Sequence, residues 1–268
     1  MKKNNQEPYA RVLVVIATLG KRNDLLRLTL ESIVKQKPIK YDIVMIFPLD
    51  NKETMALAKR FKADVVEDPG GMSAAVNAGI ATAKAHHEYI TWIGDDDMLT
   101  PGSLEASTKA LDANPQAVVA FGYCDYIDHV GRVIFTSHAG RLAPWLMTWG
   151  PDLVPLPGSL FRCSTLQQIG GFDTNNKWSM DLDVFLRLRK RGKFVNTKKT
   201  LACFRWHTGS QTVSNRPMVL KEAEMVKRKY LPRPLRLIAP FWERPVRIAT
   251  TLAVRRVNNL SRRKANLS

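Results

Sequence analysis

The first half of the chain alternates short apolar segments with longer amphipathic ones, and this alternation constrains the fold more than any other feature. Apolar, β-branched runs at residues 11–18, 41–47 and 88–94 predict strands. Each is followed by a segment typical of a helix, such as residues 23–36 after the first run. Strands alternating with helices predict an α/β fold with a mainly parallel sheet, flanked by helices on both faces. Such sheets bind ligands at the carboxyl ends of their strands.

The second half has a different pattern. Residues 124–136 indicate a hairpin that turns at Gly131, and residues 137–159 form a long loop rich in Pro, Gly and Trp. Loops of that length in compact domains are usually functional or mobile. The other elements expected here are a short helix at 164–171, a helix at 180–192 and a strand near 201–207.

The positive charge is concentrated near the C-terminus. The 268 residues carry a net charge of +17, and residues 216–268 hold 14 basic and 3 acidic side chains, or +11 of that total. We therefore expect one domain over residues 1–215 and a basic, helical tail over 216–268. In residues 246–263 apolar side chains share one side of the expected helix while several Arg lie elsewhere, a pattern typical of segments on anionic membranes. A solvated basic tail is the alternative.

Cysteine usage and the N-terminal sequence indicate a cytoplasmic protein. Cys124, Cys163 and Cys203 lie about 40 residues apart, which fits neither a disulfide framework nor a zinc site. The apolar run 12–16 is too short for a secretory signal, and no run is long enough to span a membrane. With the basic tail, this favours a cytoplasmic location, peripheral on the inner face of the cell membrane.

Three adjacent acids, Asp95, Asp96 and Asp97, follow the strand expected at 88–94. Their carboxylates repel one another, so a positive species should lie beside them. A divalent cation, Mn²⁺ or Mg²⁺, is the natural candidate because it takes oxygen ligands and bridges to phosphate. The alternative is that these acids only favour a helix N-terminus.

At these residues the chain resembles the inverting glycosyltransferases of family 2, which have the GT-A fold. The resemblance spans about residues 10 to 212 and rests on six pieces in the same order, each weak alone. It implies transfer of a sugar from a nucleotide-sugar donor to a hydroxyl of a glycan or glycolipid acceptor, with inversion and a divalent metal. A UDP-sugar is the expected donor. The pieces are VVIATLGKRNDLLRLTLESIVKQ, GGMSAAVNAG, YITWIGDDDMLTPGSL, PGSLFRCSTLQQIGGFD, MDLDVFLRLRKRGKF and FRWHTGS.

The resemblance also implies roles for individual residues. Asp181, at the start of the helix expected at 180–192, is the catalytic base that takes the proton of the acceptor hydroxyl. Its alternative role is to favour the helix N-terminus. The implied donor-binding residues are Ala17, Thr18, Asn77 and Asp95, and the implied metal-binding residues are Asp96, Asp97 and His207.

Several positions depart from the family pattern or have a plain structural alternative. The metal-binding DxD motif overlays Gly94-Asp95-Asp96, so its first acid is glycine here. In the family, an acidic residue that recognises uracil usually follows the second strand. Here the sequence is FPLDN, so Asp50 is the only acid nearby, and the base of the donor is less well indicated. His207 could equally be a packed, hydrogen-bonded residue.

Two other functions compete with an enzyme. A non-catalytic sugar-nucleotide-binding module of the same fold would keep the acidic turn but tolerate loss of Asp181. A nucleic-acid-binding protein would explain the basic excess, but the charge lies in one tail without a series of stacking aromatics or a recognised binding signature. We therefore expect no nucleic-acid partner, and place the enzyme in polysaccharide biosynthesis at the cell envelope.

Overall fold

The computed structural model describes residues 9–206 and 215–265, with the backbone alone at 216 and 261–265. It confirms the predicted alternation of strands and helices in the first half of the chain. The elements of this half are β1 (Val12–Ala17), α1 (Asn23–Val34), β2 (Tyr41–Phe47), α2 (Lys52–Arg60), β3 (Asp64–Glu67), α3 (Met72–Ala81) and β4 (Tyr89–Gly94).

The second half adds the hairpin that the sequence predicts, together with elements that it does not predict. The strand expected near 201 begins at Lys193, because pairing with the neighbouring strand extends it through a weakly patterned, lysine-rich stretch. The elements are β5 (Met98–Leu99), α4 (Ser103–Asp112), β6 (Ala117–Ile127), β7 (Val133–Ser137), α5 (Ala143–Leu146), β8 (Leu160–Arg162), α6 (Cys163–Gln168), α7 (Met180–Arg189), β9 (Lys193–Arg205), α9 (Arg216–Tyr230) and α10 (Arg233–Ala265).

The strands of the described residues form one nine-stranded sheet in the order β3-β2-β1-β4-β8-β6-β9-β5, with β7 paired to β6. Strands β1 to β4 run parallel, whereas β8 is antiparallel to both of its neighbours. Ala17 at the end of β1 pairs with Ile46 of β2 and with Gly94 of β4. The carboxyl ends of three parallel strands therefore meet at one edge, where the sequence predicts a ligand site.

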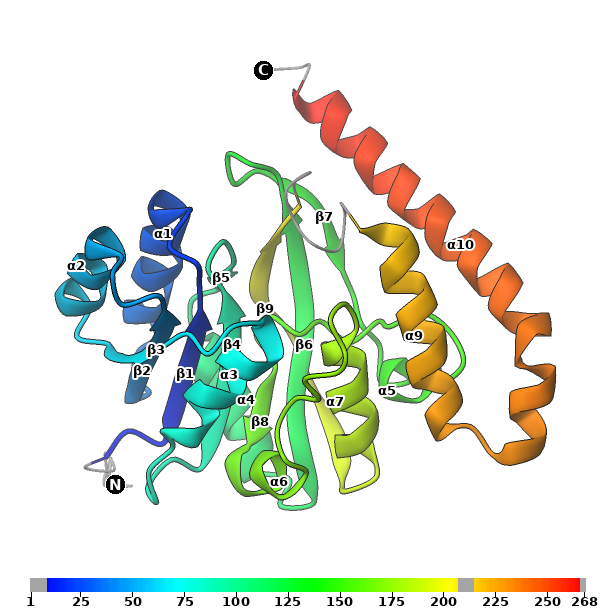
Figure 1. Ribbon diagram of the computed structural model, residues 1–268, viewed down its shortest axis with the longest axis horizontal. Coiled ribbons are helices and arrows are strands. Elements are labelled where there is room, and N and C mark those ends of the chain that lie inside the picture. The colour runs from blue at the N-terminus through cyan, green and yellow to red at the C-terminus, as the bar shows by residue number, and fades with distance from the viewer. Residues whose placement is uncertain (1–8, 207–214, 266–268) are drawn as a thin grey trace, which may run out of the picture.

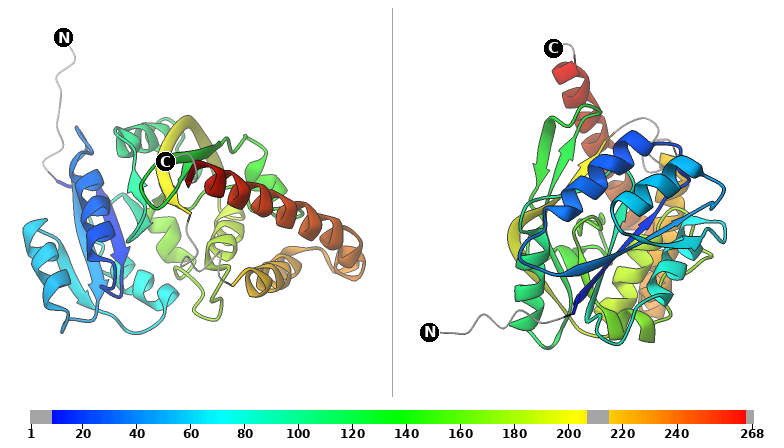
Figure 2. Two further views of the ribbon diagram at one scale, coloured as in Figure 1. Left: turned by 90° about the horizontal axis from the view of Figure 1, so that it is seen from above. Right: turned by 90° about the vertical axis from the view of Figure 1, so that its left-hand side faces the viewer.

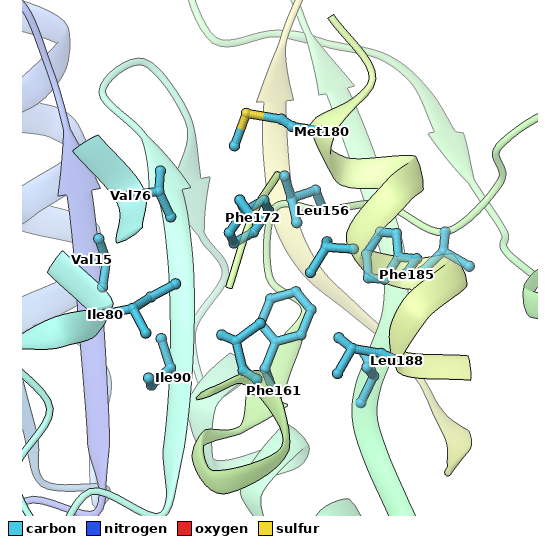
Figure 3. Close-up of a cluster of buried hydrophobic side chains, with 14 of the residues drawn as sticks. Val15, Val76, Ile80, Ile90, Leu156, Phe161, Phe172, Met180, Phe185 and Leu188 are labelled. Atoms are coloured by element: carbon cyan, nitrogen blue, oxygen red, sulfur yellow. The ribbon is translucent and has the colours of Figure 1, made fainter. Parts of the chain in front are cut away.

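Helices cover both faces of the sheet, and the core lies in two layers. In β1 the side chains alternate: Val15 packs in one layer, with α3 and α7, and Ile16 packs in the other, with α1 and α4. Figure 3 shows the first layer, where Ile80 of α3 and Phe185 of α7 approach from opposite sides with Phe161 of β8 between them. This layer fixes α7 against the sheet, which positions the start of that helix.

The two C-terminal helices pack onto the same side of the molecule as α7. Figure 1 shows α9 beside α7 and the long helix α10 outside it, running back toward β7, and Figure 2 shows the same arrangement from above. The predicted helical character of this basic segment is confirmed. The division of the chain into two domains at residue 215 stays a prediction. Within the described ranges, no helix is both long enough and apolar enough to cross a lipid bilayer.

Candidate active site

Thr18 and Asp95 lie side by side because each directly follows one of two neighbouring parallel strands, β1 and β4. Thr18 Oγ1 donates a hydrogen bond of 2.6 Å to Oδ2 of Asp95. The same hydroxyl accepts from the N–H of Gly20 at 3.0 Å. Burial raises the pKa of Asp95, although the hydrogen bond from Thr18 works against this shift. The structure thus joins two of the predicted donor-binding residues at the sheet edge.

Arg22, which precedes α1, supplies positive charge at the acidic turn. Its guanidinium donates to Oδ1 of Asp95 and, over 2.5 Å, to Oδ2 of Asp96. The sequence predicted a positive species beside these acids, but sequence reasoning did not single out Arg22. The signal was present, because Lys21 and Arg22 follow the first strand and so reach the same sheet edge as the acids.

Asp97 turns into the protein rather than toward solvent. Its Oδ1 accepts a 3.0 Å hydrogen bond from the backbone N–H of Arg205 in β9. The Arg205 side chain donates a hydrogen bond of 3.0 Å to the backbone oxygen of Asp96. The end of β9 is therefore hydrogen-bonded to the acidic turn at two points. Burial, and then the charge of Asp96, raises the pKa of Asp97 well above its usual range.

Gly94, which stands where the family motif has its first acid, makes room for the acids that follow it. A Cβ atom at this position would lie 3.1 Å from Oδ2 of Asp97 and 3.2 Å from Oδ1 of Asp96, closer than side chains normally pack. The oxygens of two carboxylates therefore converge on a position that has no side chain. This arrangement gives a physical reason for the glycine, since a larger residue would push both carboxylates away.

The residues of this turn fit a hard divalent cation. Mg²⁺ and Mn²⁺ prefer carboxylate oxygens, and Asp96 and Asp97 bring such oxygens together beside Gly94. Asp96 is also the partner of Arg22, so a cation would share that carboxylate with a guanidinium. His207 lies outside the described residues, and its predicted role as a metal ligand stays a prediction.

Asn77 of α3 holds the loop that leads to α7. Its Nδ2 donates to the backbone oxygen of Phe172, and its Oδ1 accepts from the N–H of the same residue, both at 2.8 Å. Nearby, Gly70 and Gly71 precede α3 with φ of 88°, and a Cβ at either would meet no atom within 4 Å. The open approach to the α3 N-terminus suits a phosphate. The predicted contact of Asn77 with the donor stays a prediction.

Asp181 lies in the first turn of α7, and Glu222 of α9 secures the backbone just before it. One carboxylate oxygen of Glu222 accepts from the N–H groups of Trp178 and Ser179, at 2.8 and 2.9 Å. Burial raises the pKa of Asp181, and the charge of Glu222 raises it further. Helix α9, which lies in the segment that the sequence predicted to be a tail, thus stabilises the start of α7, the helix that carries the candidate base.

Both carboxylate oxygens of Asp183, two residues after Asp181, are bonded to other side chains. Asp183 accepts a 2.8 Å hydrogen bond from the hydroxyl of Tyr230 and pairs with Arg187 at 2.7 Å. Only 2% of it is exposed. The two acids of this helix therefore differ in kind, since Asp181 is half-buried at the helix start and Asp183 is a buried link between α7 and α9.

A cavity of about 510 Å³ connects the acidic turn with α7. Gly94 and Asp97 line it on the sheet side, and Asp152 and Asp181 line it on the side of α7. Trp149 is in its wall as well, which places the long loop against the cavity. The predicted metal-binding turn and the predicted base thus border the same cavity, as a reaction between a donor and an acceptor requires.

Asp152 was missed by sequence reasoning, although it lies in the long loop that the sequence singled out. It is open to the cavity but surrounded by protein, so burial, followed by the charge of Asp181, raises its pKa to about 8. The charge of each carboxyl group affects the titration of the other, so the two lose their protons as a pair. The nearby amine of Lys227 moderates the shift of Asp152.

A separate group of potential metal ligands, Asp42, His86 and His87, lies at the opposite edge of the sheet. The N–H of Lys84 donates to Nδ1 of His87, so the hydrogen of that ring is on Nε2 and points at Asp42, 3.0 Å away. Burial lowers the pKa of His87, which keeps the ring neutral. Both ring nitrogens of His87 thus contact protein groups, and His87 links the residues before β4 to Asp42 of β2.

Comparison with known proteins identifies the family that this chain resembles. Residues 13–165 match the family described as Glycosyl transferase family 2, a match that covers more than half of the chain. An uncharacterized glycosyltransferase of Rickettsia typhi is 25% identical over 225 residues, which are 79% of this chain and 68% of the relative.

Two solved structures share the fold. S. aureus TarS, residues 1–349 in complex with UDP-GlcNAc, aligns with a TM-score of 0.60 at 12% identity, over 83% of this chain and 72% of that one. The mannosyltransferase PcManGT from Pyrobaculum calidifontis, in complex with GDP-Man and Mn²⁺, also aligns at 0.60. Its identity is 15%, over 97% of this chain and 81% of that one. At these identities the likeness shows the fold alone.

Proposed function

The chain belongs to glycosyl transferase family 2 and is a nucleotide-sugar-dependent glycosyltransferase, and from this premise we propose that it is an inverting enzyme. It transfers a sugar from a nucleotide diphosphate to a hydroxyl of a glycan or glycolipid. The observation that carries the proposal is the shared cavity, which Asp97 borders on one side and Asp181 on the other. A donor held at the acidic turn and an acceptor held at α7 meet in that space.

The donor occupies the carboxyl edge of β1 and β4. Ala17 and Thr18 border the base and ribose, and Asp95, held by Thr18, takes a ribose hydroxyl. A UDP-sugar is our first choice of donor. TarS was solved with UDP-GlcNAc and PcManGT with GDP-Man, so uracil and guanine nucleotide sugars should both be tested as donors.

A divalent cation, Mn²⁺ or Mg²⁺, is held by Asp96 and Asp97, with His207 as a further candidate ligand. When bound, it neutralises negative charge on the leaving diphosphate. Arg22 provides a second positive charge at the same place, fixed to Asp95 and Asp96. PcManGT was solved with Mn²⁺, which makes this the first metal to try.

Asp181 acts as the general base. Its carboxylate takes the proton from the acceptor hydroxyl while that oxygen bonds to the anomeric carbon, and the bond from this carbon to the diphosphate oxygen breaks on the opposite side. The half-buried position of Asp181 at the start of α7 supports this role, because it faces the cavity rather than bulk solvent. General bases of this kind contribute about 10²- to 10⁴-fold.

The outer side of α10 attaches the enzyme to an anionic membrane. Leu237 and Phe241 are 83% and 82% exposed, and Ile248 and Leu252 extend the apolar surface along the helix. Exposed arginines, among them Arg244, accompany them. Apolar and basic side chains on one exposed helix favour an anionic lipid surface. These features support our proposal of a location on the inner face of the cell membrane, with a role in polysaccharide biosynthesis for the envelope.

A nucleotide-sugar panel tests the function directly. UDP-, GDP- and dTDP-sugars are screened with and without Mn²⁺ for thermal stabilisation, since a ligand at 100 times its dissociation constant adds about 2.7 kcal/mol to the stability. We expect one class of donor to stabilise the protein in a metal-dependent manner. Absence of stabilisation by every donor at millimolar concentration, with metal present, would contradict the proposal.

A further inference from the structure

The cavity beside Asp181 continues well beyond the space that a sugar needs. Away from the acids its wall is apolar and comes from the two C-terminal helices and the long loop. Trp149 of the loop and Trp242 of α10 lie together there, with ring centres 5.8 Å apart. Along α10 the lining continues with Val246, Val254 and Val257, spaced as one side of a helix.

Specific polar contacts hold α10 in place as the outer wall of this cavity. Arg247 of α10 pairs with Glu224 of α9 at 2.5 Å, and Arg228 of α9 pairs with Glu243 of α10. Further along, Asn258 accepts a 2.7 Å hydrogen bond from the indole of Trp206, at the end of β9. These contacts fix the helix at both ends of the cavity, so the space is built into the fold.

This largely apolar space of about 510 Å³ leaves apolar side chains in contact with water, and a bound apolar chain would remove that contact. One end of this space lies at the candidate base, Asp181. Another part is lined by Trp242 and Val246 of α10, the helix whose exposed side carries Phe241. The cavity therefore fits an amphiphile that reaches it from a membrane. Its apolar wall along α10 suits the apolar chain, and Asp181 lies where the polar headgroup would be.

We propose that this cavity holds the lipid portion of a lipid-linked acceptor, with the apolar chain along Trp149, Trp242 and Val254 and the acceptor hydroxyl at Asp181. The inference rests on the proposed function and narrows its acceptor from glycans in general to amphiphiles. Exposed Leu252, on the other side of α10, belongs to the membrane surface and not to this cavity.

The position of the tryptophans provides a direct readout. Five of the six tryptophans in the chain line the cavity, and Trp145 alone does not. A bromine atom quenches an indole only at close range. The probe is therefore a maltoside with a dibrominated undecanoyl chain, used below its critical micelle concentration. Unbrominated undecanoyl maltoside competes for the same site, and maltose serves as the headgroup without a chain.

We expect the brominated maltoside to quench tryptophan fluorescence saturably, the unbrominated one to reverse the quenching, and maltose to have no effect. The double variant Val246→Phe/Val254→Phe fills the cavity and should weaken binding of the probe about tenfold or more, because several methylene groups lose their site. The matched control Ala249→Phe/Asn259→Phe adds the same rings at exposed outer-side positions of the same helix that do not line the cavity, and should bind the probe as the unaltered chain does.

Other outcomes overturn the inference. Equal competition by maltose would mean that the cavity takes a sugar, and loss of quenching in the outer-side control instead would put the probe on the helix surface. If the cavity variant does not fold, absence of saturable quenching in the unaltered chain still decides against the proposal. Donor binding is measured by calorimetry on the same samples, so failure of the proposed function shows as lost donor binding and failure of this inference as lost probe binding alone.

Discussion

The guanidinium of Arg22 lies against the carboxylate of Asp96, with 2.5 Å between Nη1 and Oδ2. The acidic turn thus contains its own counter-charge, delivered from the start of α1. A metal ion must compete with this guanidinium for Asp96.

Replacing Arg22 should therefore strengthen metal binding to the ligand-free chain. In Arg22→Gln we expect the affinity for Mn²⁺, measured by calorimetry, to rise about tenfold, because a like charge close to the cation is removed. The control is Arg27→Gln, which breaks only the pair with Glu31 one turn further along α1. If both variants bind Mn²⁺ as the unaltered chain does, Arg22 does not compete with the metal.

Asp96→Asn should abolish metal-dependent binding of the nucleotide diphosphate while the fold stays intact. The substitution removes a charged oxygen ligand at the edge of the sheet and keeps the size of the side chain. Calorimetric titration with the nucleotide, with and without Mn²⁺, checks this expectation. Unchanged metal-dependent affinity would remove Asp96 from the metal site.

Asp181→Asn should separate catalysis from donor binding. The amide keeps the size of the carboxylate but takes no proton at neutral pH, so kcat should fall about 10²-fold or more while donor affinity hardly changes. Asp24→Asn alters an exposed acid in the first turn of another helix, α1, and should leave both quantities unchanged. Loss of donor affinity together with kcat would instead make Asp181 a ligand or a structural residue.

Glu222→Gln should change both the pH profile and the stability. The charge of Glu222 raises the pKa of Asp181, so its removal should move the acid limb of the kcat profile to lower pH. Weaker bonding to the N–H groups of Trp178 and Ser179 should cost about 1–3 kcal/mol of unfolding free energy. Lys221→Gln, at the exposed neighbouring position, is the control, and an unshifted acid limb would show that Glu222 only supports the backbone.

Asp152 should make the stability of the protein depend on pH. Its pKa is raised to about 8 in the folded chain, so the folded state holds this proton more tightly than the unfolded state does. The stabilisation is present at low pH and is lost as pH rises toward 8. Melting temperatures from pH 5 to 9 should therefore fall less steeply in Asp152→Asn than in the unaltered chain, and parallel curves would contradict this assignment.

The sequence was sufficient for the parallel half of the fold and for the acidic edge. Alternating apolar residues in β1 divide between two core layers, and a strand buried on both faces has this pattern in almost any context. Thr18 and Asp95 could be placed together because parallel strands end at the same edge. By contrast, β8 has three residues and β9 contains a lysine-rich stretch, and both are strands because of their pairing with β6.

By itself, then, the sequence determined the order of the strands and helices in the first half of the chain, the acidic turn and the basic amphipathic character of the C-terminal segment, since these depend on local periodicity and on neighbouring charges. Only the tertiary structure decided that Arg22 meets Asp96, that Asp152 and Asp181 line the same cavity, and that α9 supports α7 through Glu222. These contacts join residues far apart in the chain, and no local pattern records them, because they form only when separate elements pack together.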